Sequence, residues 1–291
     1  MQCRRPIVAG QFYPGQYEAC VGEIKECLEE RALNKPLPET IRGGIVPHAG
    51  WVFSGGAAAM VFSAVKKQNK NVDTFIIFGA AHSYSGGKPS VYDKGCWQTP
   101  LGEILIDEEL AEKTIASGLA ESGRAAHQYE HSIEVQVPFI QYLFPGAKIL
   151  PIIVPPMKDA IKLGEAVGDI ISKEAEKKIV CIGSTDLTHY GPRYGFAPMG
   201  VGTHAIEWAT NVNDRQFIDS TLKLKAEDIL INAEENLNAC GPGAAAATAA
   251  AAKKLGVKEG KLLCHTNSNE IMLKKMGTSS AESVGYAAIV F

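Results

Sequence analysis

Residues 74–83 read TFIIFGAAHS, and this stretch decides the class of fold. Its first five residues form an apolar, β-rich run, which is typical of a strand buried on both faces of a parallel sheet. Small residues follow at once, and then His82. In an open α/β sheet, ligands bind beyond the carboxyl ends of the strands. The stretch therefore predicts a central strand with a functional side chain directly after it.

The same alternation continues along the chain. Further apolar runs predict strands at residues 44–46, 149–154, 179–182, 262–265 and 284–291. Segments with helical spacing or small residues predict helices at residues 18–33, 56–65, 159–177, 226–236 and 242–255. This order favours a central, mostly parallel sheet flanked by helices on both faces. No linker, repeat or charge block divides residues 1–291, so we expect a single α/β domain.

Two local signals refine these boundaries. Residues 102–106 are expected to form an edge strand, after which Asp107 caps a helix that runs to about Ser117. Residues 132–143 have a helical pattern, but Pro138 lies inside it and is expected to kink or break the helix.

The composition excludes several classes of protein. Hydrophobic residues make up 46% of the chain, charged residues 21%, and the net charge is −3 without a basic stripe, so nucleic acid is not an expected partner. The alanine-rich run at residues 243–252 is too short to cross a bilayer, and residues 1–15 lack the apolar core of a signal peptide. Seven scattered cysteines without a CxxC pair favour reduced thiols and a cytoplasmic protein over a disulfide framework.

Four stretches place reactive side chains beside small residues. They are GGIVPHAGWVFSGG with His48, GAAHS with His82, IVCIGSTDLTHYG with Asp186 and His189, and NACGPGAAAA with Cys240. A single histidine of this kind is more often a buried or loop residue than a ligand. Two histidines after equivalent strands are candidate metal ligands, because imidazole is the commonest metal ligand.

Cys240 differs from the other cysteines in its setting. Pro242 fits the first turn of the helix that follows, so the thiol is expected near a helix N-terminus, whose dipole favours the thiolate. Cys181, inside a predicted strand, is better explained as a small buried side chain.

These residues leave three interpretations open. His48, His82 and Cys240 form a set of three metal ligands, which is compatible with iron and favours copper(I) or zinc more than a carboxylate ligand would. In a metal-free alternative, Cys240 is a nucleophile, His189 a base and Asp186 its orienting group, provided that the last two face each other on one turn. In a third, the same cleft is a binding module with an aromatic wall of Trp51, Phe53 and Tyr190. Glu130 and His131 are expected to line the same site.

Five motifs in this order resemble the MEMO family: PHAGWVFSG, GAAHS, EHSIEVQVPFIQYL, STDLTHYG and CGPGAAAA. The similarity extends from VAGQFYPG to VGYAAIVF and is that of a microbial member, of the protein B type of the AmmeMemoRadiSam system. The resemblance implies a fold similar to class III extradiol (LigB-type) non-haem iron dioxygenases.

The resemblance also implies functional roles. The metal site that the resemblance implies corresponds to His48, His82 and Cys240. Iron(II) is the expected ion, with copper or zinc as alternatives. His189 corresponds to an acid–base histidine, with Asp186 and His131 beside it. Cysteine stands where the dioxygenases have a carboxylate, so the expected activity is redox or oxygenase-like on an unidentified substrate. Expected partners are AMMECR-type and radical-SAM proteins, and a small molecule or peptide in the cleft.

Overall fold

The principal sheet has four parallel strands at its centre. The computed structural model describes residues 3–291, and within them this sheet has nine strands. They are β2 (Gly43–Val46), β3 (Thr74–Gly79), β4 (Ser90–Val91), β7 (Glu121–Ser122), β8 (Lys148–Ile153), β9 (Ile179–Ser184), β10 (His189–Tyr190), β11 (Lys261–Asn267) and β12 (Ser283–Val290).

The strand order is β10-β12-β2-β9-β3-β8-β4-β7, and β11 pairs with β12. The neighbours β2, β9, β3 and β8 are all parallel, whereas β12 is antiparallel to β2, β10 and β11. Every residue of β3 and β9 is buried, as their apolar sequences predict. The expected α/β domain with a mostly parallel sheet is confirmed.

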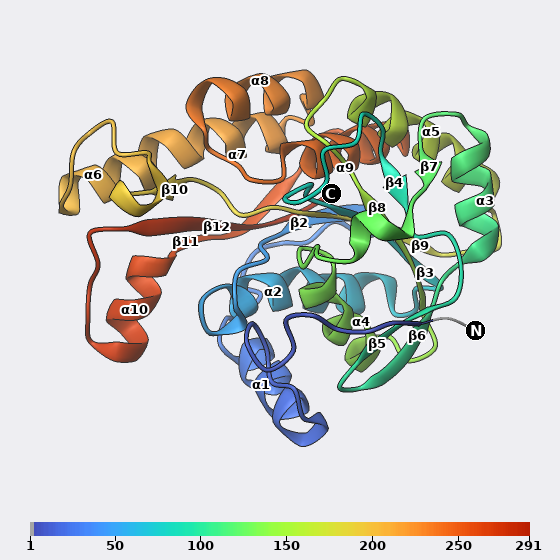
Figure 1. Cartoon of the computed structure of the whole chain (residues 1–291), viewed down its shortest axis with the longest axis horizontal. Helices are drawn as coiled ribbons and strands as arrows, with labels where there is room; N and C mark the ends of the chain where they lie inside the picture. The colour runs from blue at the N-terminus through green and yellow to red at the C-terminus, as the bar shows by residue number, and fades with distance from the viewer. Residues whose placement is uncertain (1–2) are drawn as a thin grey trace.

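Helices cover both faces of the sheet (Figure 1). One face carries α1 (Tyr17–Glu29), α2 (Trp51–Asn69) and α4 (Val137–Leu143). The other carries α3 (Glu108–Ala116), α5 (Asp159–Lys173), α7 (Asp214–Leu222), α8 (Ala226–Asn236) and α9 (Pro242–Lys254). The helices α6 (Thr203–Trp208) and α10 (Ser268–Met276) lie at the end of the sheet that β10 forms.

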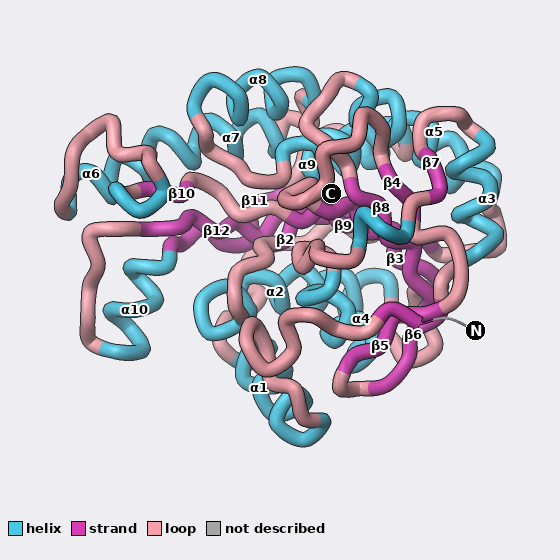
Figure 2. The backbone as a smooth tube through the Cα atoms, in the orientation of Figure 1, coloured by secondary structure: helices cyan, strands magenta, loops and turns pink. Residues whose placement is uncertain are grey.

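A separate small sheet pairs the start of the described chain with a later hairpin (Figure 2). It contains β1 (Cys3–Arg4), β5 (Cys96–Thr99) and β6 (Gly102–Leu105). Parallel pairing of β1 with β5 places Cys3 opposite Cys96, and the two form a disulfide. The prediction that the cysteines are all reduced is therefore wrong for this pair, because a register between strands 93 residues apart cannot be read from cysteine spacing.

The two local predictions, a helix cap at Asp107 and a kink or break at Pro138, are confirmed in part. The Asp107 side chain accepts a hydrogen bond from the backbone N–H of Leu110, so it is the expected helix cap. Pro138 does not break a helix: a 3₁₀ turn (Glu134–Gln136) comes first, and Pro138 lies in the first turn of α4, where its missing N–H has no cost. The helices α6, α7 and α10 were not predicted. Within residues 3–291, no helix has the length and hydropathy needed to cross a membrane.

Candidate metal centre

The site lies where three neighbouring parallel strands end. His48 follows β2 by two residues, Asp186 follows β9 by two, and His82 follows β3 by three. The fourth contributor, Cys240, lies two residues before the start of α9, which packs against these strands. Gly241 permits this approach, because a Cβ at that position would meet the carbonyl oxygen of Ser184 at 2.5 Å. The sheet order therefore brings the four predicted stretches to one edge.

The Cys240 sulfur lies among imidazole nitrogens and backbone amides. Its Sγ is 3.1 Å from Nε2 of His48 and accepts a hydrogen bond from the N–H of Asp186 at 3.3 Å. The potential ligand atoms of His48, Asp186 and Cys240 all lie within 4.8 Å of one another. The same limit holds for His48, His82 and His131. The structure thus places both Cys240 and His82 beside His48, in two overlapping groups, and adds His131 and Asp186 to the possible ligands.

The outer nitrogens of two imidazoles have polar partners. Nδ1 of His48 lies 3.0 Å from the Ser184 hydroxyl, and Nδ1 of His82 lies 3.0 Å from Oε1 of Glu130. The sequence interpretation named Glu130 only as a neighbour of the site and missed Ser184. Ser184 directly precedes the TDLTH motif, but no pattern in the sequence indicates that its hydroxyl turns toward His48.

The cluster favours a thiolate beside protonated imidazoles. Burial alone would raise the pKa of the Cys240 thiol, but the neighbouring imidazoles of His48, His189 and His82 hold it well below its usual value. Burial opposes protonation of His82, yet the Cys240 thiolate and the Glu130 carboxylate raise the pKa of His82 to about 10. The pKa of His48 is raised in the same way by Cys240 and Asp186, against the effect of burial.

His131 and Asp186 differ from this pattern. Burial and the positive charge of His48 lower the pKa of His131 to about 4, so its imidazole is neutral at physiological pH. Burial raises the pKa of Asp186, although the nearby His48 works against this effect. The neutral imidazole of His131 therefore has a lone pair available for a metal ion or a proton.

The cluster forms one wall of a cleft of about 690 Å³. Five predicted site residues line it: His48, His82, His131, Asp186 and His189. Phe53 lines it as expected, and the lining residues that the sequence did not indicate include Phe12, Arg193, Tyr194 and Tyr286. The aromatic lining therefore comes from residues spread between positions 12 and 286, which a local motif cannot reveal.

Two aromatic residues expected to line the cleft lie elsewhere. Trp51 is 1% exposed and packs between Tyr13 and Phe139, and its indole N–H donates to the carbonyl of Val135. Tyr190 is fully buried, and its hydroxyl donates to the carbonyl of Gly200. Both are core residues because their position in α2 and β10 turns them away from the cleft. The expectation that they contact a ligand is corrected.

Asp186 and His189 do not share a helical turn. Residues 185–188 have no regular secondary structure, and His189 begins β10. Asp186 uses Oδ1 to accept the backbone N–H of His48 at 2.7 Å, so it holds the β2 loop in place. Nε2 of His189 is buried and, among the described residues, has no hydrogen-bond partner. Its imidazole nevertheless lies close enough to Cys240 for each group to shift the pKa of the other.

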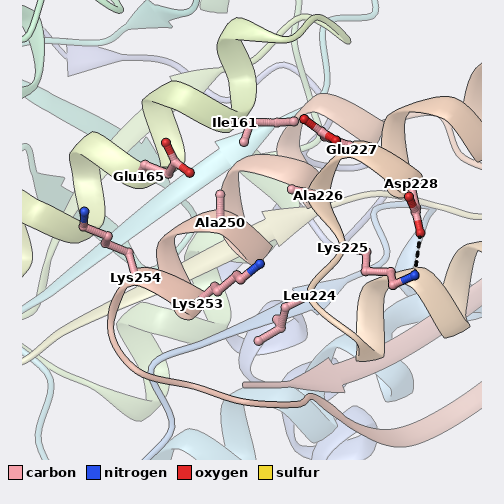
Figure 3. Close-up of a pocket in the computed structure, with 10 residues that line it drawn as sticks. All are labelled: Ile161, Glu165, Leu224, Lys225, Ala226, Glu227, Asp228, Ala250, Lys253 and Lys254. Atoms are coloured by element: carbon pink, nitrogen blue, oxygen red, sulfur yellow. Dashed lines mark ion pairs between the residues drawn. The ribbon is translucent and has the colours of Figure 1, made fainter.

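A second cavity of about 520 Å³ lies between α5, α8 and α9 (Figure 3). Its lining includes Lys225, which forms an ion pair with Asp228, and Glu165, Lys253 and Lys254. No histidine or cysteine lines it. This cavity therefore lacks the histidines that line the cleft at the strand ends.

Fold and site together define an α/β protein with a histidine–cysteine cluster beyond the carboxyl ends of its central parallel strands. The Memo-like protein family matches residues 4–290, and the chain belongs to this family. MEMO1 family proteins of Thermococcus onnurineus and Methanosarcina mazei are 38% and 37% identical to it. A further MEMO1 family protein, from Methanococcoides burtonii, is 36% identical. Each alignment covers 99% or more of this chain and 99% of the relative.

Proposed function

We propose that this chain is a metal-binding protein in which His48, His82 and Cys240 hold a single ion for redox or oxygenase-like chemistry. The observation that carries the proposal is the position of the Cys240 sulfur, 3.1 Å from Nε2 of His48 in a cluster of imidazoles. The favoured thiolate supports it as well, because only the deprotonated sulfur binds metal ions well.

The donor set fits such an ion. Two imidazoles and a thiolate are ligand types that could hold such an ion beside the cleft. A facial set of two histidines and a carboxylate is typical of non-haem iron(II), and the softer thiolate also suits copper(I) or zinc. We take iron(II) as the first candidate. When bound, the ion would supply Lewis acidity or a redox centre beside the cleft.

The chain's own groups prepare the site for this chemistry. His189 lines the cleft, where its imidazole can hold a proton near a bound substrate. Asp186 keeps the His48 loop in place through its hydrogen bond to the backbone. His131 contributes a neutral imidazole to the cleft wall.

Anaerobic titration of the metal-free protein with iron(II), copper(I) or zinc(II) tests the proposal. The wild type should bind a single tight ion, whereas Cys240→Ala should lose most of its affinity. Cys181→Ala is the matched control, because Cys181 is a buried thiol within β9 and should bind metal as the wild type does. Equal uptake by wild type and Cys240→Ala would overturn the assignment of the ligands.

A second candidate function is binding of a small molecule or peptide in the same cleft without metal chemistry. The lining of Phe12, Phe53, Tyr194 and Tyr286 favours it, because aromatic walls beside polar groups such as Arg193 are typical of ligand sites. If a small molecule or peptide that binds the wild type bound equally well after both Phe53 and Tyr194 were replaced by alanine, this candidate would be removed.

A further inference from the structure

Two polar side chains behind the cluster determine which nitrogens of the histidines face the sulfur. We propose that Glu130 and Ser184 are positioning residues that hold His82 and His48 with Nδ1–H turned outward, so that both rings present Nε2 to one ion. This inference rests on the proposed function and adds to it the ligand atoms and the groups that select them.

Glu130 acts on His82. Its side chain is 1% exposed, and its oxygens accept the backbone N–H groups of Ser132 at 2.8 Å and of His82 itself at 3.0 Å. An ionised carboxylate can only accept hydrogen bonds. Nδ1 of His82, 3.0 Å from Oε1, must therefore be the donor. In the neutral ring the lone pair is then on Nε2.

Ser184 acts on His48 by a similar argument. Its hydroxyl lies 2.8 Å from the carbonyl oxygen of Ser132, which can only accept, so the single hydroxyl hydrogen is directed there. The hydroxyl oxygen is left as an acceptor for Nδ1 of His48 at 3.0 Å. His48 thus also carries its hydrogen on Nδ1. Its Nε2 is the atom found 3.1 Å from the Cys240 sulfur.

Neighbouring groups hold the two positioning residues rigidly. Nε2 of Gln136 donates to the Ser184 hydroxyl at 3.3 Å and to the carbonyl of Pro47 at 2.8 Å, next to His48. The guanidinium of Arg4 donates to the backbone carbonyl of Glu130 at 2.8 Å. Ligand histidines commonly donate their second N–H to a carboxylate or another acceptor, which sets the ring orientation and raises ligand basicity.

Zinc(II) titration against a chromophoric chelator measures the effect of both residues. Glu130→Gln and Ser184→Ala should each bind zinc about 10- to 100-fold more weakly than the wild type. The control for the first is Asp107→Asn, because Asp107 is a buried carboxylate whose partners among the described residues are Thr74, Leu110 and Lys177. The control for the second is Ser90→Ala, a buried strand serine whose hydroxyl donates to the carbonyl of Gly123. Both controls should retain wild-type affinity, even where thermal unfolding shows lower stability.

Nitrogen-15 NMR of the imidazoles provides a second measurement that a purely structural role would not change. In the zinc-loaded wild type, His48 and His82 should both carry their hydrogen on Nδ1, and each variant should lose this preference at its own histidine. Wild-type affinity in both variants, or ligation through Nδ1, would overturn the inference. Absence of zinc binding by the wild type would instead overturn the proposed function. In that case, the tautomers of the neutral His48 and His82 rings, measured by the same NMR experiment in Cys240→Ala, would test the positioning roles of Glu130 and Ser184 separately.

Discussion

Nε2 of His48 lies 3.1 Å from Sγ of Cys240, although 192 residues separate them in the chain. His48 follows the end of β2. Cys240 precedes α9, whose start packs against the end of β9. The two groups stabilise each other's charged forms, because the imidazole lowers the pKa of the thiol and the thiolate raises that of the imidazole. This pairing underlies both the metal proposal and the reactivity of the metal-free protein.

The pairing predicts that Cys240 is alkylated at neutral pH. In the metal-free protein, iodoacetamide should modify Cys240 with a midpoint well below the ordinary thiol value, because His48, His189 and His82 favour the thiolate against the effect of burial. Cys181 is the internal control, since burial raises the pKa of its thiol to about 12. Peptide mass spectrometry across pH gives both rates. His48→Ala should shift the Cys240 midpoint upward, and an unchanged midpoint would contradict the pairing.

The ion pair of His82 and Glu130 predicts a pH-dependent stability. Cys240 and then Glu130 raise the pKa of His82 to about 10 against the effect of burial, so the contribution of the charged imidazole is fully present below the unfolded value of about 6.5 and is lost as pH rises through about 10. The pKa of Glu130 is lowered by His82 despite burial, so its contribution is present above about 4.3 and is lost as pH falls. The pair therefore contributes most between about pH 4.3 and pH 6.5.

Glu130→Gln should accordingly lower the free energy of unfolding of the metal-free protein by about 2 kcal/mol near pH 6, with a smaller difference at pH 10. The estimate is below that for a fully buried pair because the His82 side chain is 30% exposed. Urea unfolding at the two pH values provides the comparison. Glu121→Gln, at an exposed carboxylate that accepts from Tyr84, is the control and should change stability by less than about 0.5 kcal/mol. A difference that increases toward pH 10 would contradict the assigned charges.

Arg4 is expected to contribute more to stability than the ion pairs on the surface. Its guanidinium is buried, lies 2.6 Å from Oε2 of Glu134, and donates to the carbonyls of His127 and Glu130. Arg4→Met should cost about 3–5 kcal/mol, because it leaves the Glu134 carboxylate buried without its counter-charge. Lys162→Met, which breaks an exposed pair with Asp159, should cost less than about 1 kcal/mol. Similar losses in chemical denaturation would contradict this ranking.

Gly164 is predicted to be required for the packing of α5 on α9. A Cβ at this position would overlap the backbone of Ala247, which cannot move aside as a flexible side chain can. Gly164→Ala should therefore lower the free energy of unfolding by about 2 kcal/mol. Gly22→Ala is the matched control inside α1, where the added Cβ meets no atom within 4 Å. It should stabilise the protein by up to about 1 kcal/mol, and thermal unfolding of both variants tests the pair.

The sequence by itself determined the α/β class, the central strands and the four stretches that carry the reactive side chains. This was possible because buried parallel strands are uniformly apolar, as in residues 74–78, and because small residues beside His48, His82 and Cys240 stand out locally. The Asp107 helix cap was also predictable, because its hydrogen bond spans only three residues.

Only the tertiary structure decided what depends on contacts between distant segments. The parallel order β2-β9-β3 and the approach of α9 determine that His48 and Cys240 meet. The direction of a side chain from its element decided that Trp51 and Tyr190 are core residues. The Ser184 hydroxyl, the Glu130 carboxylate and the Cys3–Cys96 disulfide depend on register and on partners 48 or more residues away. Such partners leave no local pattern, because their geometry exists only once the chain is folded.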